Sequence, residues 1–280
     1  MTGKTGFVVV RKRPEYPHQE IMDGIAACGD HAIKGYASQT GDANTAVVTW
    51  HPYGRQGAAA QCHLRLGGRH IVIENGYVRR DAVGEAQYCV EFDGFNGQGW
   101  IPKHGSDSWK WHRLGVDLRP WRQTGEHILI CGQRGGDYSD YSMPMDWPDS
   151  IIDRLPHLTD RPLKYRPHPG RPWQPARRNG VEFTDPRRPI YADLEQAHAC
   201  VVWCSNAATE AIISGVPVFY QGPTLKLASI ACDDLTLIED PPMEHRAEAL
   251  AQLAWSQWSL SDLRSGAAWK FLMYSAEGRA

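Results

Sequence analysis

Residues 200–218, Cys-Val-Val-Trp-Cys-Ser-Asn-Ala-Ala-Thr-Glu-Ala-Ile-Ile-Ser-Gly-Val-Pro-Val, contain the pattern that decides the fold class. The apolar, β-branched run Cys200–Trp203 predicts a buried strand, and Ala207–Ser214 predicts a helix. The run Val216–Tyr220 predicts a second buried strand. A buried strand that leads through a helix into another buried strand is typical of a parallel α/β sheet.

The same alternation extends along the whole chain. Further strands are predicted at Phe7–Val10, Ala46–Trp50, Ile71–Ile73, Tyr88–Phe92, Ile128–Cys131, Leu163–Arg166 and Leu235–Ile238. Further helices are predicted at Pro148–Leu155, Pro189–Ala197, Met243–Trp255 and Leu260–Tyr274, the last with Ser259 and Asp262 as a variant of the capping box. The 280 residues suffice for two domains. The segment 94–125, dense in Gly, Trp and basic residues, predicts a boundary between domains 1–124 and 125–280, with the C-terminal helices closing the second.

The composition excludes several classes of protein. Apolar residues at 42% and charged residues at 22% are ordinary for a globular protein, which excludes a disordered or collagen-like chain. The N-terminus lacks the pattern of a signal peptide, and no apolar run is long enough to cross a bilayer, so we expect a soluble, cytoplasmic protein. The seven cysteines are an odd number in mostly apolar runs, which predicts reduced thiols. Cys200 and Cys204 have no second pair of ligands at zinc-finger spacing, so no metal site is predicted.

Two motifs lie at the ends of predicted strands, where open α/β sheets bind their ligands. Glu74, in the string Glu-Asn-Gly-Tyr-Val-Arg at 74–79, is a candidate general base toward a substrate hydroxyl, and the alternative is a solvated Glu in a surface turn. His168 lies between two prolines after the strand Leu163–Arg166. It is a candidate donor to a phosphate, and the alternative is a histidine in a rigid turn.

A third motif begins the helix that follows Cys200–Trp203. Ser205, Asn206 and Thr209 fall in its first turn, where hydroxyl groups and free backbone N–H groups predict an anion site. The alternative is simple capping of the helix by Ser205, and the two interpretations are compatible.

The order of these motifs resembles the acidic-Gly, His-Pro and Ser series of bacterial sialyltransferases and of capsular polysaccharide Kdo transferases. The stretches Ile128–Gln133 and Gly136–Ser139 are similar to the capsule branch, and the resemblance runs from about residue 70 to residue 220. It implies a GT-B-type glycosyltransferase of class α/β, with two Rossmann-like domains facing a central cleft. The acceptor would bind domain 1–124 and the nucleotide sugar domain 125–280. No required metal and no permanently bound cofactor are implied.

The resemblance also implies roles for individual residues. Glu74 becomes the base and His168 a contact to the donor phosphate. The donor-binding residues become Gln133, Arg166, Ser205, Asn206, Thr209 and Glu210. Asn75 and Asn206 replace a second acid and a second hydroxyl residue of the family pattern, so both a UDP-sugar and a CMP-sugar stay open as co-substrate. Asp93, after the strand Tyr88–Phe92, is the reserve candidate for the base.

The acceptor is suggested by local charge, since 30 basic and 32 acidic residues leave a net charge of only −2. Residues 161–188 contain eight Lys and Arg against two acids, and residues 97–122 interleave basic residues with Trp. Basic side chains can contact successive phosphates and aromatic rings can stack on bases, so this combination predicts a nucleic-acid groove. Two alternatives stay open. Sugars also stack on Trp, and some of these Arg could bind the donor diphosphate while some of the Trp pack in the core. The candidate acceptor contacts are Arg79, Trp109, Trp111, Arg113, Arg171, Arg177 and Arg178.

The compact chain also resembles glycosyltransferases of tailed phages that modify hydroxymethylated pyrimidines in DNA. The leading hypothesis is therefore a DNA-base glycosyltransferase, which would act in the host cytoplasm if phage-encoded. A capsule-type or lipopolysaccharide sugar transferase is the alternative, and a binding module without turnover is the alternative of another class. Trp255, Trp258 and Trp269 near the C-terminus are predicted to pack in the core, because few cations accompany them as they would on a membrane face.

Overall fold

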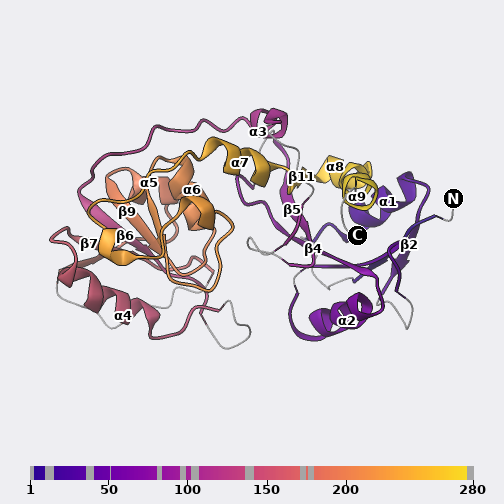
Figure 1. Cartoon of the computed structure of the whole chain (residues 1–280), viewed down its shortest axis with the longest axis horizontal. Coiled ribbons are helices and arrows are strands. Elements are labelled where there is room, and N and C mark those ends of the chain that lie inside the picture. The colour runs from indigo at the N-terminus through magenta and orange to yellow at the C-terminus, as the bar shows by residue number, and fades with distance from the viewer. Residues whose placement is uncertain are drawn as a thin grey trace. The chain divides into compact units, whose positions relative to one another are not determined.

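A computed structural model describes residues 3–9, 16–35, 41–50, 52–80, 84–94, 99–101, 107–135, 142–170, 175 and 180–275. The chain forms two compact units (Figure 1). The first unit comprises residues 1–116 and 250–280, and the second comprises residues 117–249. Within the described residues, no helix has the length and apolar character needed to span a membrane.

The first unit is built on a six-stranded sheet. Its strands are β1 (Thr5–Val8), β2 (His31–Lys34), β3 (Thr45–Thr49), β4 (Arg69–Asn75), β5 (Gln87–Phe92) and β11 (Gln257–Ser259). Their order is β11-β5-β4-β3-β1-β2. The four strands from β4 to β2 are parallel, whereas β5 runs antiparallel to β4 and β11 antiparallel to β5.

Helices cover both faces of this sheet. They are α1 (His18–Ala27), α2 (Gly54–Arg65), α3 (Trp109–Arg113), α8 (Leu260–Arg264) and α9 (Ala267–Tyr274). Helices α1, α8 and α9 lie on one face and α2 lies on the other (Figure 1). The larger core contains Trp255, Trp258 and Trp269, which confirms that the C-terminal tryptophans are core residues.

The C-terminal segment belongs to the first unit, which corrects the expectation that it closes the second. The reason is that β11 extends the first sheet, with Gln257 opposite Cys89 of β5, and that α8 packs against α1. The first boundary lies at residue 116 instead of 124, and the chain returns to the first unit within α7 (Ala247–Ala254). The capping box of Ser259 and Asp262 is confirmed, but Gly266 at φ +82° divides the expected long helix into α8 and α9.

The second unit has a five-stranded sheet that is parallel throughout. Its strands are β6 (His127–Cys131), β7 (Leu163–Arg166), β8 (Val181–Phe183), β9 (Ala197–Val202) and β10 (Val218–Tyr220), in the order β10-β9-β6-β7-β8. Helix α4 (Trp147–Arg154) lies on one face, and α5 (Ile190–Leu194) and α6 (Ala207–Ile213) lie on the other (Figure 1). Short 3-10 turns occur at η2 (Leu155–His157), η3 (Ala228–Ile230) and η4 (Leu235–Leu237).

The turn η4 replaces a predicted strand at Leu235–Ile238. The side chain of Asp234 accepts a hydrogen bond from the backbone N–H of Thr236 at 2.9 Å and thereby starts a helical turn. A short apolar run is compatible with either a strand or a buried turn, and the preceding Asp decides between them here. The α/β class with two largely parallel sheets is confirmed.

Candidate functional site

The sheet of the second unit has a topological switch point between β6 and β9. From β6 the chain continues to β7 and β8 on one side of the sheet, and it then returns to β9 and β10 on the other side. The loop after β6 leads to α4 on one face of the sheet, whereas the loop after β9 leads to α6 on the other face (Figure 1). Open α/β sheets bind their ligands at such a switch point, at the carboxyl ends of the strands.

Gln133 and Cys204 bridge this switch point. The side-chain Oε1 of Gln133 accepts a hydrogen bond from the backbone N–H of Cys204 at 3.2 Å, and Nε2 of Gln133 lies 3.4 Å from the Cys204 sulfur. The bridge ties the loop after β6 to the loop after β9. Gln133 therefore lies at the carboxyl edge of this sheet, and its contact to a donor stays a prediction.

The turn between β9 and α6 carries Ser205 and Asn206, both half-buried. The Ser205 Oγ accepts a hydrogen bond from the N–H of Ala207 at 3.3 Å, so the capping interpretation holds for this hydroxyl. Asn206 Oδ1 accepts a hydrogen bond from the ammonium of Lys226 at 3.3 Å. Lys226 lies in the loop after β10, so three loops of the second unit contribute polar groups to the carboxyl edge of its sheet.

Two other predicted donor contacts from α6 have different surroundings. Thr209 is fully buried, which places its hydroxyl beyond the reach of a ligand at the surface and corrects its predicted role. Glu210, one residue further along the first turn, is half-buried and stays accessible.

His168 and Arg134 lie together at the ends of the adjacent strands β7 and β6. The His168 Nδ1 accepts a hydrogen bond from the N–H of Gly170 at 3.0 Å, which leaves Nε2 as the N–H donor of a neutral ring. A Cβ at Gly170 would lie 2.9 Å from Nη2 of Arg134 and 3.2 Å from Cε1 of His168. An exposed guanidinium and an imidazole therefore flank one glycine, where both can donate hydrogen bonds to an anion.

Arg166 has an internal role, in contrast to its predicted donor contact. Its buried guanidinium forms an ion pair with the buried carboxylate of Asp193 at 2.5 Å. It also donates hydrogen bonds to the carbonyl oxygens of Pro186 at 3.1 Å and Arg188 at 2.6 Å. These contacts engage the guanidinium within the unit, so Arg166 stabilises the turn 185–188 that follows β8.

Glu74 lies near the carboxyl end of β4 in the first unit, as predicted. The half-buried carboxylate accepts a hydrogen bond from the phenol of Tyr77 at 3.4 Å. Tyr77 itself is buried, so its hydroxyl is a fixed hydrogen-bond donor to Glu74. A carboxylate at a strand end has the chemistry of a general base.

Asp93 lies in the same sheet but at the other end of β4, away from the carboxyl end where Glu74 lies. Because β5 runs antiparallel to β4, the residue after β5 lies beside the start of β4, where the backbone N–H of His70 donates to Asp93 Oδ1 at 3.1 Å. Three residues of β4 lie between His70 and Glu74, and this spacing of four residue steps is roughly 13 Å of extended chain. Asp93, at φ +56°, therefore cannot replace Glu74 as the base at the carboxyl edge.

The basic side chains that suggested DNA are mostly engaged within their own units. Arg113 pairs with Asp262 at 3.2 Å, and Arg79 donates to the carbonyl oxygen of Gly115 at 3.5 Å. Trp109 is 46% exposed, and Trp111 is half-buried. Further ion pairs join Arg161 to Glu239, Lys164 to Glu182 and Arg187 to Asp185. Arg171, Arg177 and Arg178 lie outside the described residues.

Arg134 and Lys226 are site cations that the sequence prediction missed. Arg134 directly follows Gln133, so its place after a predicted strand was a usable signal. Lys226 lies six residues after β10, in a loop with no motif around it. Among the described residues, no group of three or more His, Cys, Asp or Glu side chains is arranged to hold a metal ion.

Two solved structures are similar to the chain over nearly its whole length. The Thermosulfurimonas dismutans KpsC β-Kdo 2,4 transferase aligns with a TM-score of 0.63 at 14% identity, over 90% of this chain and 90% of the other. The β-Kdo 2,7 transferase of KpsC from the same organism aligns with a TM-score of 0.56 at 14% identity, over 95% of this chain and 99% of the other. The fold is of the GT-B type. No protein-family model and no curated protein matches the sequence.

The GT-B likeness agrees with the fold predicted from the motifs and concerns the fold alone at this level of identity. In such a fold the carboxyl edges of the two sheets are the places to look for substrate contacts. Glu74 lies at that edge in the first unit. Gln133, Arg134, His168, Ser205, Asn206 and Lys226 lie at that edge in the second unit, and we refer to these six residues as the anion-site residues.

Proposed function

We propose that this protein is a glycosyltransferase that moves a sugar from a nucleotide-sugar donor to a hydroxyl group of a glycan. The observation that carries the proposal is the set of anion-site residues at the switch point of the second unit. They combine two cations, an imidazole N–H donor and three neutral polar side chains on four separate loops. A phosphate linked to a nucleoside is the ligand that suits such a set in a GT-B fold.

The anion-site residues would stabilise the leaving group. As the bond between the anomeric carbon and the donor phosphate oxygen breaks, its electron pair passes to that oxygen and adds negative charge to the phosphate. Arg134, Lys226 and the Nε2–H of His168 would donate hydrogen bonds to this charge. The structural likeness to KpsC makes Kdo the first sugar to test, and both CMP- and UDP-linked donors are included in the proposal.

Glu74 of the first unit would be the general base. Its carboxylate would take the proton of the acceptor hydroxyl while the acceptor oxygen forms the new bond to the anomeric carbon. The Tyr77 hydroxyl, which donates to Glu74, would orient the carboxylate. The reaction needs no permanently bound cofactor, and we propose that it also proceeds without a metal ion.

A glycan is a better supported acceptor than DNA. Arg113, Arg161, Lys164 and Arg187 are paired with carboxylates inside their own units, which reduces the cationic surface available to a phosphate backbone. The exposed Trp109 ring can stack on a sugar as well as on a base. Hydroxymethylpyrimidine DNA is the second candidate acceptor, and the exposed Trp109 ring is the observation that supports it.

One experiment separates these alternatives. The full chain is incubated with CMP-Kdo, other CMP-sugars and UDP-sugars, each with acidic oligosaccharides or with hydroxymethylated DNA, in the presence and absence of EDTA. Mass spectrometry of the acceptors should show a sugar added to the oligosaccharide in both buffers. Product on DNA alone would overturn the glycan assignment, and activity lost in EDTA would overturn metal independence. Donor binding without any turnover would instead identify a binding module.

A further inference from the structure

The loop that follows Glu74 is held by a side chain from the far end of the chain. Gln257 of β11 accepts a hydrogen bond from the N–H of Val78 through Oε1 at 2.9 Å. Its Nε2 donates to the carbonyl oxygen of Arg79 at 3.0 Å. The amide of Gln257, which is only 2% exposed, thus satisfies a donor and an acceptor of two consecutive residues in this loop.

The register of the sheet puts Gln257 on the same face as Glu74. Glu74 of β4 lies opposite Cys89 of β5, and Cys89 lies opposite Gln257 of β11. Residues that are directly opposite in antiparallel strands point to the same face. Cys89 completes the connection, because its sulfur accepts a hydrogen bond from the N–H of Tyr77 at 3.3 Å and lies 3.9 Å from Gln257 Oε1.

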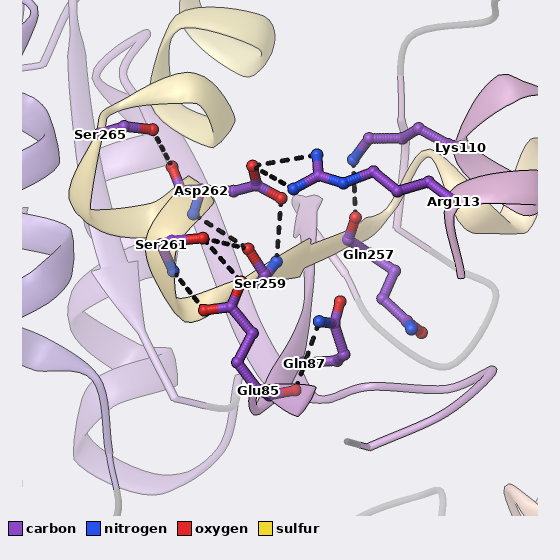
Figure 2. Close-up of polar contacts among 9 residues, drawn as sticks. All are labelled: Glu85, Gln87, Lys110, Arg113, Gln257, Ser259, Ser261, Asp262 and Ser265. Atoms are coloured by element: carbon purple, nitrogen blue, oxygen red, sulfur yellow. Dashed lines mark hydrogen bonds and ion pairs between the residues drawn. The ribbon is translucent and has the colours of Figure 1, made fainter. Parts of the chain in front are cut away.

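The backbone of Gln257 is itself held in place by other residues. The buried ammonium of Lys110 donates to the carbonyl oxygen of Gln257 at 2.6 Å (Figure 2). Further along the segment, the guanidinium of Arg113 pairs with Asp262 at 3.2 Å, and the side chains of Ser261 and Glu85 are hydrogen-bonded at 2.7 Å. The strand β11 is therefore anchored at its first residue and directly after its last.

We propose that Gln257 is a positioning residue for Glu74, acting through residues 77–79 of the loop. Tyr77 connects the two, since its N–H is held beside Gln257 through Cys89 and its hydroxyl holds the Glu74 carboxylate. Without the Gln257 amide, the N–H of Val78 and the carbonyl of Arg79 lose their partners, and the loop relaxes. The proposal rests on the proposed function, in which Glu74 is the base.

The first test compares Gln257→Met, which keeps the length of the side chain but removes both hydrogen bonds, with the wild type. Amide hydrogen exchange at Val78 should accelerate at least about tenfold, and kcat should fall about 10- to 100-fold with the donor KM nearly unchanged. The matched control is Ser261→Ala, which removes a contact of the same segment to Glu85 and leaves residues 77–79 untouched. It should retain wild-type exchange at Val78 and wild-type kcat.

The second test uses Gln257→Glu and a pH profile. In its protonated form the introduced carboxyl can accept from Val78 N–H and donate to the Arg79 carbonyl, as the amide does, whereas its ionised form can only accept. Burial raises the pKa of such a carboxyl. The kcat of this variant relative to wild type should therefore rise as the pH falls from about 8 to about 6. The comparison with wild type accounts for Lys110, which contacts the Gln257 carbonyl and whose pKa is lowered by burial to about 7. A purely structural loss would leave the ratio to wild type independent of pH.

The outcomes separate the two proposals. Unchanged exchange at Val78 in Gln257→Met would overturn the role of Gln257, whatever the activity. Accelerated exchange with an unchanged kcat, or a Gln257→Glu ratio that does not vary with pH, would show that the loop contact does not position the base. A wild-type chain that transfers no sugar to any acceptor would instead count against the proposed function, while the exchange data would still report whether Gln257 holds the loop.

Discussion

Lys110 Nζ lies 3.0 Å from the centroid of the Trp258 ring, inside the first unit. Burial lowers the pKa of Lys110 to about 7, with a further lowering by Arg113 and opposing effects of Asp262 and Cys89. The ammonium group nevertheless has two favourable contacts, the face of the Trp258 ring and the carbonyl oxygen of Gln257. The helix α3, at 109–113, is thus attached to β11 by the buried side chain of Lys110.

Lys110 should make the stability of the protein depend on pH. The pKa is about 7 in the folded protein and 10.5 in an ordinary lysine, so between these values the unfolded chain binds more protons. The free energy of unfolding should therefore increase with pH over that range, by at most about 1.4 kcal/mol per pH unit. The stability of wild type relative to Lys110→Met, measured by urea unfolding from pH 7 to 9.5, should rise accordingly. A difference that stays constant with pH would contradict this prediction.

Glu74→Gln should remove the general base while keeping the shape of the side chain. We expect kcat to fall about 10²- to 10⁴-fold with the affinity for the donor nearly unchanged, as measured by steady-state kinetics and calorimetry. Asp93→Asn is the matched control, since Asn tolerates a positive φ and keeps an acceptor for the N–H of His70. It should retain most of the activity. Equal losses in both variants would refute the assignment of Glu74.

Arg134→Ala and Lys226→Ala should weaken donor binding. Each substitution removes a cation from the anion-site residues, and a hydrogen bond between charged groups contributes about 1.5–3 kcal/mol, which corresponds to about a 10- to 100-fold higher dissociation constant. The effect should shrink at high salt. Lys164→Ala is the control, because this lysine lies in the same sheet but pairs with Glu182. A loss as large in the control would show that overall charge, and not this site, determines binding.

Arg166→Met should destabilise the second unit. The substitution leaves the carboxylate of Asp193 buried without its cation, with the Thr184 hydroxyl as a hydrogen-bond donor at 2.9 Å. Removal of one member of a buried ion pair costs about 3–5 kcal/mol, which urea unfolding followed by circular dichroism can measure. Arg187→Ala, in an exposed pair with Asp185, should leave the unfolding curve nearly unchanged. A stable Arg166→Met variant with impaired donor binding would restore the predicted ligand role of Arg166.

Several elements were predictable because their signals are local. The strand at Leu163–Arg166 has the predicted bounds, and β5 and β6 differ from the prediction by one residue. Helix α2 was missed because it contains two glycines and mostly small or polar residues between Gly54 and Arg65, which obscure an apolar stripe. The strand predicted at Leu235–Ile238 failed because a short apolar run carries no period of its own.

The sequence by itself determined the α/β class and the strand ends at which Glu74, His168 and Ser205 lie, since both follow from the order of apolar runs and turn residues along the chain. The tertiary structure decided which strands became neighbours and in which direction they run. It joined the C-terminal strand to β5, moved Asp93 to the edge away from Glu74, and directed Arg166 toward Asp193. These outcomes depend on hydrogen bonds and ion pairs between residues far apart in the sequence, which leave no periodic pattern along the chain.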